Sequence, residues 1–143
     1  LENAEFLQFG QIHRNTFINS PKVLDAALQT KNNPKGFFAG QITGDEGYVE
    51  SVATGWLAGI NAVRLANEQS LVTAPITGAI GSLCRYVSNT ETKNFQPVKI
   101  TFALIQELPV ELRKKYRNKR ERHGIQVERA LVDWDNWIGE IGL

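Results

Sequence analysis

The feature that most constrains the fold is a glycine-rich turn in residues 36–51, which separates an apolar run from a long helical pattern. The run Phe37-Phe38-Ala39 predicts a short buried strand. Glycine permits a sharp turn and a close ligand approach, and three glycines follow: Gly40, Gly44 and Gly47. Thr43 and Glu46 stand at capping-box spacing, which predicts that a helix begins there. Such a helix N-terminus suits a phosphate or an electron-rich ring edge, whereas a plain strand-to-helix connection uses the same residues.

The clearest predicted element is a helix over residues 47–67. Ser51, Gly55 and Gly59 recur every four residues and therefore line one face of it. Glycine inside a helix costs about 1 kcal/mol relative to alanine, so this face predicts the close approach of a neighbouring element. The bulk of the buried stripe is expected at adjacent positions: Val49, Val52, Trp56, Ile60 and Val63.

The segments around this helix carry weaker signals. Residues 5–18 are expected to be extended, 19–21 form a turn or a helix start, and 23–30 fit a helix and a strand equally poorly. Thr73 and Pro75 predict the start of a second helix. Its core face is expected at four positions: Ile76, Ile80, Leu83 and Val87.

The alternating pattern of residues 95–104 predicts a strand, and Pro109 opens the last helical region. We expect Gly124 to bend or interrupt that region. Its apolar face is expected at Val127, Leu131, Trp134 and Ile138. Cys84 lies beside the core face of the second helix, and no thiolate-activating cluster surrounds it in the sequence. We therefore expect a small buried hydrophobe there rather than a catalytic thiol.

Composition limits the class of protein. The chain has 143 residues, of which 42% are hydrophobic and 22% charged, as expected of one globular domain. Its net charge of +1 shows no overall excess of positive charge that would indicate nucleic-acid binding. A single cysteine excludes an internal disulfide framework and favours the reducing cytoplasm. Metal-ligand spacings, a nucleophile elbow, a P-loop, a Gly-x-Gly-x-x-Gly fingerprint and a membrane-length apolar run are all missing from the sequence. Because the chain starts at Leu1 and has no methionine, we expect it to be a piece of a longer protein.

A polar block near the N-terminus is the first candidate site. In an extended segment Gln11, His13 and Asn15 share one face, with Arg14 between them. A flat imidazole beside amide and guanidinium donors can stack on a heteroaromatic ligand and hydrogen-bond to it. A polar loop whose side chains bond the local backbone is the alternative.

A basic run is the second candidate site. Residues 113–122 hold seven basic side chains against one acid, with Tyr116 among them, on a predicted helix. The basic residues are Arg113, Lys114, Lys115, Arg117, Lys119, Arg120 and Arg122. Such a face can neutralise phosphates along an RNA backbone, and a solvated helix face explains the run equally well.

Taken together, these segments resemble a known family. The blocks 11–21, 37–44 and 46–51 closely resemble the folate- and flavin-dependent tRNA (uracil-5-)-methyltransferases, the TrmFO family. The match continues in order through residues 59–62, 83–87 and 94–97, so it covers nearly the whole chain. The related family that modifies the tRNA wobble uridine shares the Phe-Phe-Ala-Gly-Gln turn but not the His-Arg-Asn-Thr block, and it fits less well.

The resemblance implies a specific chemistry. Members of the family bind FAD, take a carbon from 5,10-methylenetetrahydrofolate, reduce the flavin with NAD(P)H and methylate C5 of a T-loop uridine in tRNA. The turn would approach the flavin through Gly40, Gln41, Ile42, Thr43, Gly44, Gly47 and Tyr48. His13 would stack on the folate pterin, Arg14 and Asn15 would shape that pocket, and Tyr48 would also line it. The basic run would face the tRNA.

The resemblance also implies an architecture and its gaps. Residues 1–69 would be the C-terminal part of a Rossmann-like FAD domain of the α/β class, and 70–143 a mostly helical segment with one or two strands. The family's cysteines and its glycine fingerprint belong to the N-terminal half, so this chain would hold no catalytic residue. That half, or a second copy of the chain, would cover its exposed faces. A non-catalytic RNA-binding or interaction module is the competing hypothesis.

Two residues depart from the family's pattern. Asp45 stands where valine is common, which brings a carboxyl group into the flavin loop. If Asp45 points at the ring, it would disfavour the reduced, anionic flavin; if it points to solvent, it would do little. Cys84 stands where leucine is usual, which fits a core position.

Overall fold

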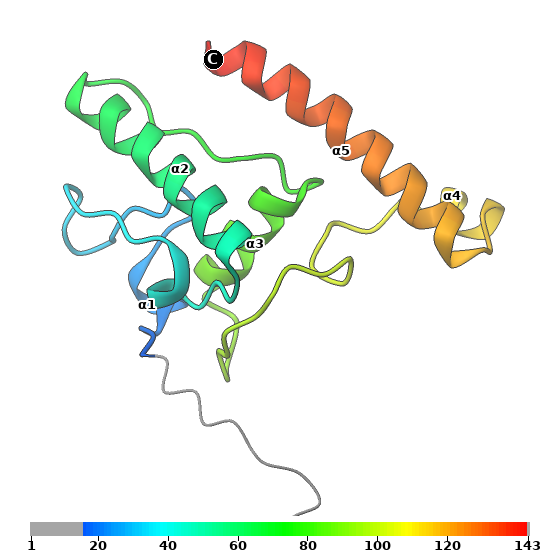
Figure 1. Ribbon diagram of the computed structural model, residues 1–143, viewed down its shortest axis with the longest axis horizontal. Coiled ribbons are helices and arrows are strands. Elements are labelled where there is room, and N and C mark those ends of the chain that lie inside the picture. Colours follow the sequence, from blue (N-terminus) through cyan, green and yellow to red (C-terminus); the bar gives the residue numbers. More distant parts are fainter. Residues whose placement is uncertain (1–15, 143) are drawn as a thin grey trace, which may run out of the picture.

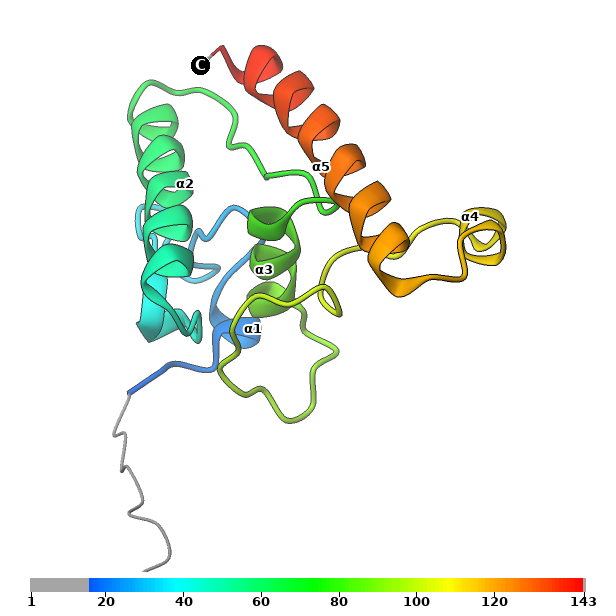
Figure 2. The same ribbon diagram turned by 45° about the vertical axis from the view of Figure 1, so that its right-hand side comes forward.

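Helices dominate the computed structural model, which describes residues 16–142 (Figure 1). In chain order they are α1 (Ser20–Val23), the 3₁₀ helix η1 (Gly40–Thr43), α2 (Tyr48–Ala66), α3 (Ala79–Ser88), α4 (Val110–Lys115) and α5 (Lys119–Ile141). The helices α1, α2 and α3 form one body, while α4 and the start of α5 extend away from it in both views (Figures 1 and 2). None of the described helices is long and apolar enough to cross a membrane.

The strands expected at residues 37–39 and 95–104 are wrong for the described part of the chain. Backbone pairing there consists of three isolated bridges: Leu24 with Thr30, Gln29 with Phe37, and Asp45 with Val98. A strand persists only when a neighbour pairs along its length, and these segments meet their partners at single residues. Phe38 is accordingly half-exposed rather than buried. The α/β class is therefore not seen in these residues.

The long helix was predicted correctly, but its start was not. Helix α2 begins after Gly47 and ends before Asn67, as expected. The capping box is wrong, because Gly47 is the N-cap and no side chain caps the helix. The Thr43 hydroxyl instead lies 2.7 Å from the carbonyl oxygen of Gly40, inside η1.

The buried face of α2 also differs from the prediction. Its buried residues are Thr54, Leu57, Ala58 and Asn61. The valines of the expected stripe are exposed: the exposed fraction is 79% for Val49, 73% for Val52 and 61% for Val63. Asn61 fixes the orientation, because its buried amide donates to the carbonyls of Ala27 and Val72 at 3.0 and 2.9 Å. Nothing lies within 4 Å of a Cβ placed at Gly55 or Gly59, so the element expected against that face is not among the described residues.

The shorter helices follow their local signals only in part. Asn19 precedes α1, as the turn signal predicted. Residues 24–30 form a turn instead of a helix or strand, because the Asp25 carboxylate accepts from the backbone N–H groups of Ala27 and Gln29. Helix α3 begins at Ala79, six residues after the predicted N-cap Thr73.

The core face predicted for α3 is mostly confirmed. Leu83 and Val87 are buried, and so is Cys84, whereas Ile76 precedes the helix and is 36% exposed. Burial raises the pKa of the Cys84 thiol to about 12, which suits an inert core residue.

A tryptophan cluster holds the last helix on the body. The ring of Trp56 on α2 lies 5.7 Å from that of Trp134 and 6.1 Å from that of Trp137, both on α5. Pro109 precedes α4 as predicted, but α5 runs through Gly124 without the expected interruption. Val127 and Leu131, which were expected on the apolar face, are 44% and 59% exposed.

Candidate functional site

The glycine turn of residues 40–48 is held in a backbone conformation that its glycines allow. Gly40, Gly44 and Gly47 have φ angles of 74°, 93° and 141°. A Cβ at Gly44 would lie 2.6 Å from the ring of Phe95, and one at Gly47 would strike the Glu50 carboxylate. The conformation and packing of the turn therefore require these glycines by themselves, with or without a ligand.

Two hydrogen bonds fix this turn on the rest of the chain. The N–H of Gly40 donates to the hydroxyl of Thr54 on α2 at 3.0 Å. The Ser20 hydroxyl donates to the carbonyl of Thr43 at 2.8 Å, from the start of α1. The turn is thus a rigid wall held from both sides.

The first turn of α2 lies open beside this wall. Tyr48 is 95% exposed and Val49 79% exposed, and Gly47 offers no capping side chain. The Glu50 carboxylate lies beside Gly47, where it accepts from the backbone N–H of Ile100 at 3.2 Å rather than from an N–H of the helix. The first backbone N–H groups of α2 are therefore uncapped by any side chain of the described residues and can meet an electron-rich ligand edge.

Asp45 is directed into the interior beneath this turn. Its side chain is fully buried, with Oδ2 3.0 Å from the Thr43 hydroxyl, while Oδ1 has no hydrogen-bond partner among the described residues. Burial raises the pKa of Asp45 above its ordinary value. The solvent-facing orientation considered from the sequence is wrong. A buried carboxyl with one unpartnered oxygen favours its neutral form.

The polar block His13, Arg14 and Asn15 lies outside the described residues. The chain that follows it reaches the glycine turn, because the N–H of Ile18 donates to the carbonyl of Ile42 at 2.9 Å. The described chain is thus bonded to the glycine turn at a position three residues after Asn15 in the sequence.

The basic run lies on two helices rather than one. Arg113, Lys114 and Lys115 end α4, whereas Lys119, Arg120 and Arg122 begin α5. Residues 116–118 between the two helices are not helical. There Arg122 donates to the carbonyls of Tyr116 and Arg117 at 3.3 and 2.8 Å. The basic side chains therefore lie on two helices, α4 and α5, which both line one pocket.

One aromatic pair in that pocket corresponds to no local sequence motif. The rings of Phe102 and His123 are stacked face to face, with centroids 3.8 Å apart and an interplanar angle of 3°. Twenty-one positions separate them, so no short motif could have linked them. Within residues 16–142 we find no cluster of three or more His, Cys, Asp or Glu side chains that could hold a metal ion.

Comparison with known proteins gives consistent results over almost the whole chain. The family model of glucose inhibited division protein A matches residues 1–70. A protein of Koribacter versatilis is 50% identical over 138 residues, which cover 96% of this chain and 31% of that protein. Relatives from Desulforamulus reducens and Lactobacillus delbrueckii are 51% and 52% identical and are matched over 30% of their lengths. All three carry the name methylenetetrahydrofolate–tRNA-(uracil-5-)-methyltransferase TrmFO. The chain thus spans about a third of the length of these curated relatives.

Proposed function

Because the chain belongs to the TrmFO family, we propose that it is the C-terminal part of a tRNA (uracil-5-)-methyltransferase. The whole protein would transfer a methylene carbon from 5,10-methylenetetrahydrofolate to C5 of a T-loop uridine and reduce it to methyl. FAD would supply the redox chemistry, with NAD(P)H as reductant. This chain contributes binding surfaces and no catalytic residue.

The observation that carries this proposal is the rigid glycine turn beside the open start of α2. Its backbone, from Gly40 through Gln41, Ile42, Thr43 and Gly44 to Gly47, would form one wall of the flavin pocket. The uncapped N–H groups of α2 favour the electron-rich edge of a flavin ring over an apolar ligand. The exposed ring of Tyr48 stands at the rim, where it can line the approach of folate or of the target base.

The folate contacts would come from the polar block. Asn15 lies three residues before Ile18, which is bonded to the turn, so their Cα atoms are at most about 11 Å apart. In this proposal His13 would stack on the pterin, and Arg14 and Asn15 would shape that pocket.

The exposed face of α2 would contact the N-terminal part of the complete protein. Val49, Val52 and Val63 present branched apolar side chains to solvent, and Gly55 and Gly59 leave room for a close approach. The chain covers about 31% of its relatives, so an occupant of sufficient size exists in the family. Residues 1–69 would complete the FAD and folate domain, and residues 70–143 would form the helical segment that carries the basic surface towards tRNA.

Flavin binding tests the proposal. FAD fluorescence is titrated with this chain, with the N-terminal two thirds of a relative, and with the two mixed. We expect binding and quenching in the mixture, and weaker binding when Tyr48→Ala replaces the parent chain. Tyr116→Ala, far from the turn, is the matched control. If the mixture does not bind FAD while the chain alone binds tRNA, the proposal is wrong and the chain is a non-catalytic RNA-binding module.

A further inference from the structure

A pocket lies between the basic helices, outside the proposed flavin wall. Its volume is about 790 Å³, and it is bounded by residues 101–108, helix α4 and the first turns of α5. The basic surface is therefore hollowed rather than flat. A hollow of this size can admit a single nucleotide.

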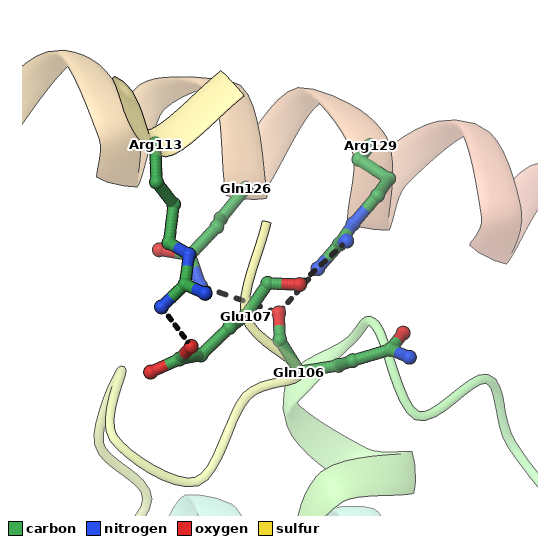
Figure 3. Close-up of polar contacts among 5 residues, drawn as sticks. All are labelled: Gln106, Glu107, Arg113, Gln126 and Arg129. Carbon is green, nitrogen blue, oxygen red and sulfur yellow. Dashed lines mark hydrogen bonds and ion pairs between the residues drawn. The ribbon is translucent and has the colours of Figure 1, made fainter. Parts of the chain in front are cut away.

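The walls of this pocket are tied together by polar contacts (Figure 3). Arg129 on α5 donates to the carbonyls of Gln106 and Glu107, and the amide of Gln126 donates to Gln106 at 3.4 Å. Arg113 on α4 forms an ion pair with the Glu107 carboxylate. One short segment is thus held from both helices, and the pocket is preformed.

The charge in the pocket is positive. Arg113, Lys114, Lys119 and Arg122 line it, against the single carboxylate of Glu107. Glu107 is occupied by Arg113, and neither Lys114 nor Lys119 has an ion-pair partner within residues 16–142. Two ammonium groups from different helices are therefore available for an anion such as a phosphate.

A flat aromatic surface accompanies these charges. Phe102 lines the pocket, remains 38% exposed and is backed by the stacked ring of His123. Unpaired bases stack on such rings whatever their identity, because every base has a π-face. Cations beside an aromatic platform are the combination that binds single-stranded nucleic acid, whereas a phosphate alone needs no ring.

We propose that this pocket binds one unpaired, non-reacting nucleotide of the RNA substrate. Its phosphate would meet Lys114 and Lys119, and its base would extend the stack of Phe102 and His123. This step rests on the proposed tRNA substrate but not on the flavin site. It makes the second half of the chain a reader of looped RNA rather than of duplex.

The test uses fluorescence anisotropy with the full 143-residue chain. The ligands are a labelled single-stranded oligoribonucleotide, the same sequence in a duplex, and inorganic polyphosphate. Phe102→Leu should weaken single-strand binding at least about fivefold and leave polyphosphate binding unchanged, because only a base uses the ring. Lys114→Gln combined with Lys119→Gln should weaken binding of single strand and polyphosphate alike and reduce the salt dependence.

Exposed lysines outside the pocket give the matched control. Lys35→Gln combined with Lys93→Gln removes the same charge and should leave single-strand affinity within about twofold. Equal losses in both double variants would overturn the proposal in favour of diffuse attraction, as would a Phe102→Leu variant that binds single strands like the parent. Circular dichroism establishes that each variant is folded, and His123→Ala provides a second test of the stack. FAD binding by the mixed parts should not change, so failure here leaves the flavin proposal standing.

Discussion

The carboxyl oxygen Oδ2 of Asp45 lies 3.0 Å from the hydroxyl oxygen of Thr43, and both side chains are fully buried. The same hydroxyl lies 2.7 Å from the carbonyl of Gly40. A hydroxyl carries one proton, so if Thr43 donates to Gly40, Asp45 must donate to Thr43. The neutral acid satisfies both contacts, in line with the raised pKa of Asp45.

Asp45 therefore makes stability depend on pH. The folded chain keeps a proton that the unfolded chain releases above the ordinary pKa of 3.8, so stability falls as pH rises from that value through the raised pKa. Asp45→Val removes both the titration and the unpaired Oδ1, and we expect a gain of about 1–3 kcal/mol at pH 7. The gain should shrink towards pH 4.

Thermal unfolding between pH 4 and pH 8 measures this effect. Asp45→Asn retains the shape without the titration, and its pH profile should be equally flat. Asp135→Asn, on the exposed side of α5, should follow the parent at every pH. A gain for Asp45→Val that is the same at pH 4 and pH 7 would show that Asp45 does not titrate in this way.

Two glycines, one in the turn and one inside α2, should respond in opposite ways to alanine. Gly44 has a φ of 93°, and a Cβ there meets the Phe95 ring at 2.6 Å. Gly59 lies inside α2, and its Cβ would meet nothing within 4 Å. We expect Gly44→Ala to cost about 1–3 kcal/mol, and Gly59→Ala to stabilise the chain by about 0.5–1 kcal/mol. Urea unfolding measures both, and a neutral Gly44→Ala would contradict the strain argument.

The Cys84 thiol should be inert in the folded chain. It is 1% exposed, and burial raises its pKa to about 12, so both access and thiolate are lacking at pH 8. A thiol reagent should label it only as fast as the chain unfolds. Labelling rates in increasing urea measure this, and rapid modification without urea would restore a reactive thiol to consideration.

Local signals predicted helix α2 well because its helical pattern extends over many residues and because Gly47 and Asn67 mark its two ends. They could not assign its buried face, since the valines are apolar whether they meet this chain or another part of the protein. The alternation of residues 95–104 failed for a related reason: it records apolar spacing but not the presence of a partner strand. The basic run could be recognised from its charge. The pocket within it depends on the interruption between α4 and α5 at residues 116–118 and on Phe102, and no local sequence pattern connects these two features.

The exposed face of α2 gives the sharpest test of assembly. Val52 is 73% exposed, so Val52→Glu should change the stability of this chain by less than about 0.5 kcal/mol. If the N-terminal part packs there, the same change buries a charge and removes apolar contact, and association should weaken at least about tenfold. Gly59→Leu should act likewise by filling the space for close approach.

Val127→Glu is the control, because Val127 is a valine on α5 that is also exposed, at 44% against 73% for Val52. Calorimetric titration of the N-terminal part into each variant measures the affinity, and unfolding of the chain alone measures its stability. Association that survives both α2 substitutions but fails with Val127→Glu would move the interface to α5. Loss restricted to the α2 variants would mean that the valines predicted as core are core residues of the assembled protein, exposed here only because their partner lies in another part of it.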